Sequence, residues 1–378
     1  MNKERLHRMA YTGVGYAAHY LDEMRVKPPI TSNSSNQEGP HILFTFWDAP
    51  GYRKSRELME ELQGKFGGSG LPIGIGLFVR PWANVLSRSI DYVYDRNHNT
   101  GFKEAAAETK TPVLFIAAGM QWNEVTYPKS PLLQKLEERD ENLMRYADGT
   151  RVQRVFQPPS DKLPSALRGL FGTDKNGVVY LDYNAPEVEH YREKNLRLVA
   201  KDIQDFARNY PGLYLGACVE NEVDFPGTWV TGDRELEVGS QEDRIEIVRE
   251  VLETNVRIFK EAGLTNIYTN QSIEDAENRG SPLSTAFIEG ANVGITTWKT
   301  GNISTFNQAA ELAKQHGVNW ALPITNPLSF TEHANLVELT NAKLFNPKFI
   351  GFYNWWPHFP GYGVRGMVLE KVIKALTK

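Results

Sequence analysis

Carboxylates follow an apolar segment in the stretch GACVENEVDFPG, residues 216–227. Small and apolar residues lead into Glu220, Asn221 and Glu222, which come one after another. Cleavage of a glycosidic bond needs two carboxyl groups across the bond, one of which protonates the leaving oxygen. Glu222 is the best acid/base candidate of the stretch. Glu220 points the same way if the strand stays regular, so one carboxylate could hold the other or Arg80. A solvated charged loop is the competing interpretation.

Seven other apolar segments of strand length also stop at amide, charged or indole side chains. Such groups suit a sugar, because amides and charges hydrogen-bond hydroxyls while indole faces stack on the C–H face of the ring. A single Trp more often packs than binds, but several of the segments have a Trp near the carboxyl end. The expected substrate-binding residues are Asp48, Arg80, Trp122, Asn221, Asn270, Gln271, Trp298, Asn326, Asn354, Trp355, Trp356 and His358.

The elements that must position these side chains alternate along the chain. Strands are expected at 41–50, 72–82, 111–122, 213–223, 265–272, 291–301, 318–327 and 349–358. Their continuous apolar runs are typical of strands buried on both faces. Amphipathic helices are expected at 53–66, 185–210, 242–263 and 304–317. This alternation predicts an α/β fold, a (β/α)₈ TIM barrel whose active residues lie at the carboxyl ends of the strands. A doubly wound open sheet is the alternative, but no G-x-G-x-x-G turn follows the first strand.

The chain is expected to hold one catalytic domain. Residues 1–40 are interpreted as an N-terminal helix, at 4–25, followed by a strap rich in Pro, Ser and Asn. Residues 41–378 form the predicted barrel, with a long insertion between the third and fourth strands at about 123–180. The insertion would lie over the mouth of the barrel, as a lid that faces the substrate or as plain surface elaboration.

Composition argues against several classes of partner. The formal net charge of −4 gives no excess of basic residues for nucleic acid or an anionic membrane. No apolar segment reaches the ~18 residues that a membrane-spanning helix needs. The eight His are scattered without paired metal-ligand spacing, so neither a metal nor another cofactor is expected. The single Cys218 excludes an internal disulfide and is expected to be a buried apolar residue. The sequence holds no signal of oligomeric state.

The N-terminus is too polar for a secretory signal. We therefore expect a cytoplasmic protein, or a periplasmic or secreted one if a signal peptide has been removed.

Residues 181–223 resemble the segment that leads to the acid/base in clan A glycoside hydrolases, notably the family 42 β-galactosidases and more loosely family 5. The shared order is Asp182, the helix start 184–188, Tyr210-Pro211 and then Asn221-Glu222. The resemblance implies that Asn221 contacts the sugar 2-hydroxyl and that Glu222 is the acid/base. It also implies substrate contacts for Arg80 at strand two, and for Trp355 or Trp356 at strand eight.

The seventh strand departs from the pattern of that clan, whose nucleophile is a Glu at this strand end. Here the segment reads WALPITNPLSF, with Thr325 and Asn326 at the position in question and Glu332 six residues further on. Glu332 could fold back into the site. Another carboxylate, such as Asp48, Glu220 or Glu274, could take the role instead. Loss of the function would leave a barrel that binds sugar without cleaving it.

We therefore predict a glycoside hydrolase that acts on an oligo- or polysaccharide, with Glu222 as acid/base and Glu220 or Glu332 as the second carboxylate. The alternatives are a non-catalytic carbohydrate-binding barrel and another barrel enzyme, such as a lyase or aldolase.

Overall fold

The structure, a computed structural model, describes a defined part of the chain. The described ranges are 40–46, 51–69, 72–79, 94, 99–117, 135–151, 153–154, 178–179, 181–182, 184–219, 241–272, 288–297, 303–325 and 345–353. The chain divides into two units, Met1–Gln37 and Glu38–Lys378, and every described residue belongs to the second. The helix expected at 4–25 lies outside the described residues.

One parallel sheet dominates the second unit. Its strands are β1 (His41–Phe46), β2 (Ile73–Val79), β3 (Val113–Ala117), β6 (Tyr214–Cys218), β7 (Ile267–Tyr268), β8 (Gln271–Ser272), β9 (Val293–Thr297), β10 (Trp320–Thr325) and β11 (Phe349–Tyr353). They pair in the order β7-β6-β3-β2-β1-β11-β10-β9-β8, and every paired neighbour is parallel. The first and last strands of the chain, β1 and β11, are neighbours in this order, as a closed sheet requires.

The two strands at the ends of this order are halves of one strand. Only Thr269 and Asn270 separate β7 from β8, and β7 pairs with β6 while β8 pairs with β9. At the break the amide of Thr269 donates to the carbonyl of Asn292, at 3.0 Å. The sheet therefore closes on itself as an eight-stranded barrel, and the predicted (β/α)₈ fold is confirmed. All eight predicted strands lie where the sequence indicates.

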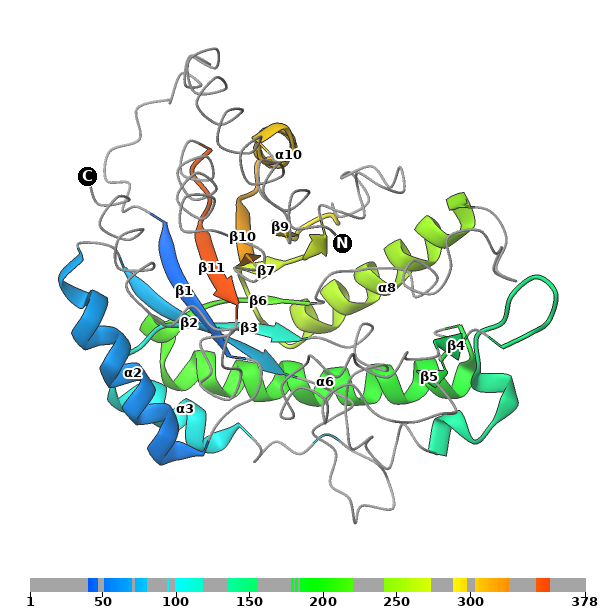
Figure 1. Cartoon of the computed structure of the whole chain (residues 1–378), viewed down its shortest axis with the longest axis horizontal. Helices are drawn as coiled ribbons and strands as arrows, with labels where there is room; N and C mark the ends of the chain where they lie inside the picture. Colours follow the sequence, from blue (N-terminus) through cyan, green and yellow to red (C-terminus); the bar gives the residue numbers. More distant parts are fainter. Residues whose placement is uncertain are drawn as a thin grey trace, which may run out of the picture. The chain divides into compact units, whose positions relative to one another are not determined.

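Helices follow the strands and lie outside them. They are α2 (Tyr52–Phe66), α3 (Thr100–Glu108), α6 (Pro186–Asn209), α8 (Gln241–Glu261) and α10 (Ile303–Gln315). Figure 1 shows α2, α3, α6 and α8 outside the strands. Four of them confirm the predicted helices, while α3 was not predicted. Helix α6 begins at Pro186, whose fixed φ and missing N–H suit a first turn.

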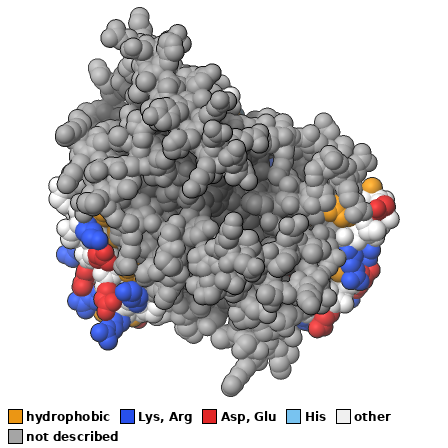
Figure 2. Space-filling view, viewed as in Figure 1, with side chains coloured by type: hydrophobic (Ala, Val, Ile, Leu, Met, Phe, Trp, Pro, Cys, Tyr) orange, Lys and Arg blue, Asp and Glu red, His pale blue; other side chains and the backbone are white. Residues whose placement is uncertain are grey.

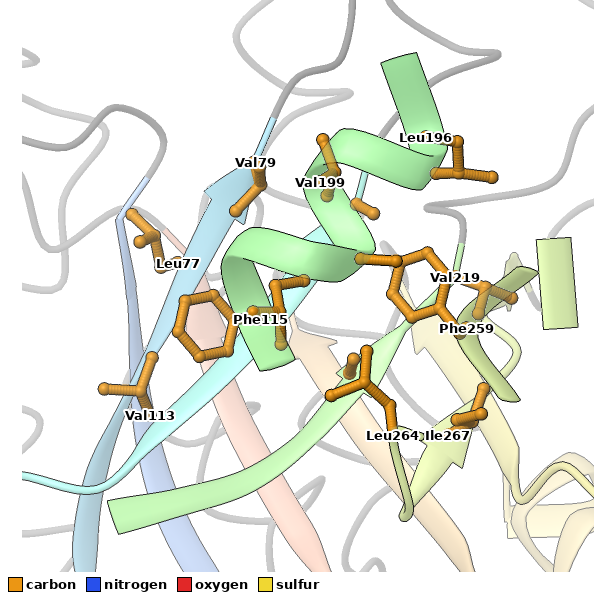
Figure 3. Packing of buried hydrophobic residues seen from close by; sticks show 14 of the residues in the cluster. Leu77, Val79, Val113, Phe115, Leu196, Val199, Val219, Phe259, Leu264 and Ile267 are labelled. Atoms are coloured by element: carbon orange, nitrogen blue, oxygen red, sulfur yellow. The ribbon is translucent and has the colours of Figure 1, made fainter. Parts of the chain in front are cut away.

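Two hydrophobic layers hold the barrel. One fills its interior and consists of Leu43, Phe78, Leu114, Ile116, Cys218, Tyr268, Ala321 and Phe349. The other lies between the strands and the helices. Figure 3 shows part of it, where Leu196 and Val199 of α6 pack over strands that carry Val79 and Phe115. The alternation of side chains along each strand separates the two layers, so that Leu43 faces inward and Phe44 outward.

The insertion after β3 has little regular structure among its described residues. A short antiparallel pair joins β4 (Gln153–Arg154) to β5 (Val178–Val179). Glu187, in the first turn of α6, accepts hydrogen bonds from Arg139 Nη1 at 2.8 Å and Asn142 Nδ2 at 3.0 Å. These contacts attach the insertion to the amino-terminal end of α6. A lid function for the insertion stays a prediction.

Candidate active site at the carboxyl ends of the strands

The carboxyl ends of all the barrel strands lie at one rim, because the strands are parallel. Four predicted site residues come directly after the last residue of a strand. Arg80 follows β2, Trp298 follows β9, Asn326 follows β10 and Asn354 follows β11. These four residues therefore follow the strands at the carboxyl-terminal rim, where barrels of this kind have their active sites.

Most of the predicted site residues lie outside the described residues. These are Glu222, Glu220, Glu332, Asp48, Arg80, Trp122, Asn221, Trp298, Asn326, Asn354, Trp355, Trp356 and His358. Two are described. Asn270 lies between β7 and β8 and is fully buried. Gln271 begins β8, where it pairs with Ile295 of β9. The break in the fifth strand thus places an amide side chain, Asn270, inside the protein.

Below the rim, the interior of the barrel is almost wholly apolar. Burial raises the pKa of the Cys218 thiol, and burial, followed by the nearby Cys218, raises that of the Tyr268 hydroxyl. Both groups therefore stay protonated at neutral pH, and a protonated thiol is a poor nucleophile. The ring of Tyr268 packs edge-on against Phe349, with centroids 5.2 Å apart. This layer is a packed floor, so acid–base chemistry at this end of the barrel must come from residues at the rim.

Thr45 is a polar exception in that floor. It is fully buried, and its Oγ1 has no hydrogen-bond partner in the described structure. The side chain lies over Gly76 of β2, where an added Cβ would come within 2.7 Å of Thr45 Oγ1. We did not predict Thr45 from the sequence, although a hydroxyl inside the apolar strand HILFTF is the signal that could have revealed it.

The end of β6 is held by side chains from two helices. Asn255 of α8 donates through Nδ2 to the carbonyl oxygen of Val219, at 3.3 Å. The Oδ1 atom of the same amide accepts from Arg192 Nη1 of α6, at 2.8 Å. All three residues are buried, and Val219 immediately precedes Glu220. The amide of Val219 also donates to the carbonyl of Tyr268, at 2.9 Å. Both backbone polar groups of Val219, its N–H and its carbonyl oxygen, are therefore hydrogen-bonded.

A second buried polar group supports the connection from β2 to α3. The amide of Tyr94 donates to Asn195 Oδ1 of α6 at 2.6 Å, and the Tyr94 hydroxyl lies 3.3 Å from Asp202 Oδ2. Asn99 Nδ2 donates to the Tyr94 hydroxyl at 3.0 Å, and Lys103 Nζ lies 2.5 Å from Asp202 Oδ1. Helix α6 therefore makes polar contacts on two sides. Asn195 binds Tyr94 in the connection from β2 to α3, and Arg192 binds Asn255 of α8, the helix that holds the end of β6.

These supporting residues were also missed. Arg192, Asn195 and Asn255 are polar positions on the buried faces of amphipathic helices. That placement is the sequence signal that could have found them. It does not show which partners they meet.

Within the described residues, no group of three His, Cys, Asp or Glu side chains could hold a metal ion. No helix among them is both long and apolar enough to cross a membrane. On the face drawn in Figure 2, the coloured Lys and Arg side chains lie among Asp and Glu side chains. Pairs such as Arg56–Glu60 on α2, at 2.8 Å, and Arg197–Glu261 between α6 and α8, at 2.6 Å, show the same mixture of signs.

Several solved structures are similar to this chain. The catalytic domain of a β-amylase from Paenibacillus polymyxa aligns over 91% of this chain and 100% of its own, with a TM-score of 0.55 and 11% sequence identity. An exo-β-1,4-mannosidase from Opitutaceae bacterium strain TAV5 aligns over 91% of this chain and 57% of its own, with a TM-score of 0.47 and 9% identity. A GH26 β-mannanase from Bacteroides ovatus aligns over 90% and 89%, with a TM-score of 0.47 and 11% identity.

The fold comparison rests on the β-amylase domain, which alone of these three has a TM-score above 0.5. No protein-family model and no curated protein matches the sequence. At this identity the similarity is one of fold alone, that of a TIM barrel. The narrower resemblance to family 42 stays a prediction.

Proposed function

We propose that this protein is a glycoside hydrolase that cleaves a glycosidic bond of an oligo- or polysaccharide, with Glu222 as the general acid/base. The observation that carries the proposal is the position of the carboxyl end of β6. This end lies at the rim, and after Val219 the chain continues with Glu220, Asn221 and Glu222. Consecutive Cα atoms are about 3.8 Å apart, so the Cα atom of Glu222 lies within about 15 Å of the Cα atom of Cys218, the last residue of β6. The same limit keeps Arg80, Trp298 and Asn354 close to their own strand ends.

The proposed division of labour follows the chemistry of the side chains. Arg80, Asn221, Asn270 and Gln271 bind hydroxyl groups. The sugar rings stack on the indoles of Trp298, Trp355 and Trp356. Asp48, Trp122, Asn326, Asn354 and His358 complete the substrate-binding rim. The apolar floor supports this arrangement, because a dry surface beneath the substrate strengthens the polar contacts above it.

The test is the variant Glu222→Gln, which keeps the shape of the side chain and removes its proton transfer. The substrates are the phenyl α- and β-glycosides of glucose, galactose, mannose and xylose, whose leaving group needs protonation, together with β-mannan and starch. Loss of a general acid/base lowers turnover by about 10²- to 10⁴-fold, and we expect a loss of that order on the glycoside that the wild-type protein cleaves. The matched control is Asp224→Asn, a carboxylate of the same stretch with no assigned role. Near-wild-type turnover in Glu222→Gln would reject the proposal.

The second carboxylate is tested by Glu220→Gln and Glu332→Gln under the same conditions. The variant that loses turnover as deeply as Glu222→Gln identifies the partner. The anomer first released, followed by NMR, then gives the separation of the two carboxyl groups. Retention corresponds to about 5–5.5 Å and inversion to roughly 6.5–9.5 Å.

A non-catalytic sugar-binding barrel is the second candidate function. One observation favours it: β10 ends at Thr325, and Asn326 follows where the resembling clan has its nucleophile. Saturable binding of an oligosaccharide in calorimetry, with no product after long incubation, would support this function over hydrolysis.

A further inference from the structure

We propose that Arg192 and Asn255 form a positioning relay that fixes the carboxyl end of β6 and thereby sets the direction of the acid/base Glu222. This inference rests on the proposed function, which it deepens. Neither residue is part of the rim, so both would act through the backbone of Val219 rather than by touching substrate.

The relay is directional. Asn255 uses both halves of its amide, accepting from Arg192 Nη1 at 2.8 Å and donating to the Val219 carbonyl at 3.3 Å. The exposed fractions of Arg192, Asn255 and Val219 are only 5%, 1% and 0%. A buried donor or acceptor without a hydrogen bond costs free energy, so each contact holds the next in place. A flipped amide would set two donors against each other at one end and two acceptors at the other.

The point at which the relay acts gives it leverage on the site. The Val219 oxygen belongs to the planar peptide unit that joins Val219 to Glu220, so a hydrogen bond to it restrains the orientation of that unit. On the other side of the residue, the Val219 amide is held by the Tyr268 carbonyl at 2.9 Å. Glu222 is three residues beyond Val219. A rotation of this peptide unit would therefore change the direction in which the chain leaves Val219 toward the proposed acid/base.

The apolar neighbours of Val219 make its carbonyl dependent on the relay. Val219 belongs to the layer between strands and helices, with Phe259, Leu264 and Ile267, and Figure 3 shows these side chains between α6, α8 and the strands. Since these neighbours offer only hydrocarbon, a polar side chain must reach the carbonyl from a helix. Asn255 does so from α8, and Arg192 holds Asn255 from α6.

Two substitutions of Asn255 test the relay. Asn255→Asp keeps an acceptor for Arg192 but places a carboxylate oxygen, without a donor, against the Val219 carbonyl. Asn255→Leu removes both contacts at similar volume. The matched control is Asp202→Asn, which disturbs another buried polar group of α6. Asp202 lies ten residues from Arg192 on the same helix, about 15 Å along its axis. It contacts α3 and Tyr94 rather than β6.

The first readout is amide hydrogen exchange of the peptide that covers residues 214–223, measured by mass spectrometry on the full-length protein. We expect faster exchange in Asn255→Asp and Asn255→Leu, with the wild-type rate in Asp202→Asn. Unchanged exchange in Asn255→Asp would overturn the proposal, whether or not the protein is an enzyme.

The second readout is the dependence of kcat/KM on the leaving group, measured with the 2,4-dinitrophenyl and phenyl glycosides of the sugar that the wild type cleaves. A misdirected general acid slows the phenyl glycoside, which needs protonation, more than the dinitrophenyl glycoside, which does not. Misplacement costs up to about 100-fold, so we expect Asn255→Asp to lose roughly 10- to 100-fold on the phenyl glycoside and severalfold at most on the other. Equal losses on both substrates, or the same pattern in Asp202→Asn, would mean that Asn255 only stabilises the fold, and would overturn the proposal.

The two readouts distinguish the failure of this inference from the failure of the proposed function. If the wild type cleaves no glycoside or Glu222→Gln is fully active, the proposed function fails, and with it the link from the relay to Glu222. If Glu222→Gln is inactive but the Asn255 variants show neither change, the function stands and the relay is wrong.

Discussion

The contact between Thr45 and Gly76 allows a quantitative test of the floor beneath the proposed site. In Gly76→Ala the new Cβ would lie 2.7 Å from Thr45 Oγ1 and 3.3 Å from its Cβ and Cγ2. Thr45 is fully buried and β-branched, so few rotamers are open to it. Overpacking of this kind costs about 1–3 kcal/mol, and alanine regains about 0.5–1 kcal/mol over glycine in a strand. We expect the free energy of unfolding to fall by about 0.5–2 kcal/mol.

The same substitution should behave differently in a Thr45→Ala background. The Oγ1 and Cγ2 atoms are then absent, so the preference of the strand for alanine remains and most of the clash is gone. Gly76→Ala should become neutral or stabilise by up to about 1 kcal/mol. The difference between the two backgrounds is a coupling energy of about 0.5–3 kcal/mol, the range found for residues in contact.

Thermal unfolding followed by circular dichroism measures both effects. At about 2.1 cal/mol/K per residue, a chain of 378 residues unfolds with an entropy of about 0.8 kcal/mol/K. A change of about 1.5 kcal/mol then moves Tm by about 2 °C. The four proteins of the cycle should be compared under one set of conditions, with urea unfolding as a second measure. If Gly76→Ala lowers Tm by the same amount with and without the Thr45 side chain, the packing argument is refuted.

Two further predictions concern buried ionisable groups. The free energy of unfolding should fall as pH rises above about 9. Burial raises the pKa values of Cys218, Tyr214 and Tyr268, so at this pH the unfolded chain releases protons that the folded chain retains. Each such proton costs about 1.4 kcal/mol of stability per pH unit. Urea titrations of the wild type and Cys218→Ala between pH 8 and 10 should show a shallower fall in the variant, and equal slopes would contradict the argument. Lys103→Met should cost about 3–5 kcal/mol in urea unfolding, because it leaves the buried Asp202 carboxylate without its ammonium partner. Adding Asp202→Asn should recover most of that loss, and a double variant no more stable than the single one would speak against it.

The sequence was sufficient to predict the barrel because its strands are buried on both faces. All seven residues of β2, IGIGLFV, are buried, and such an uninterrupted apolar run is easily recognised. Helix α3 was missed because TGFKEAAAE gives only nine residues in which to detect a period. The break at Thr269–Asn270 was also missed, since it depends on a hydrogen bond from Thr269 to Asn292, a residue that comes after a long connection.

The candidate site could be predicted only where chain order alone was enough. Parallel strands bring their carboxyl ends together, so the residues that follow those ends could be grouped without coordinates. The side-chain contacts that hold the end of β6 could not be predicted in this way. Arg192 and Asn255 are 63 residues apart, and the pairing of two polar side chains on buried helix faces is decided by the packing of α6 on α8. The orphan hydroxyl of Thr45 depends likewise on the close approach of Gly76 on the neighbouring strand.

The pairing of β1 with β11 has a consequence for how the chain folds during synthesis. His41 pairs with Phe349 in the closed sheet, so about 300 residues of chain separate two neighbouring strands. At 5–20 residues per second, β11 leaves the ribosome roughly 15–60 s after β1. Until then, one edge of β1 presents unpaired backbone groups to any strand that approaches. Completion of the barrel therefore waits for the synthesis of β11, and protection of β1 by a chaperone should matter most for the nascent chain.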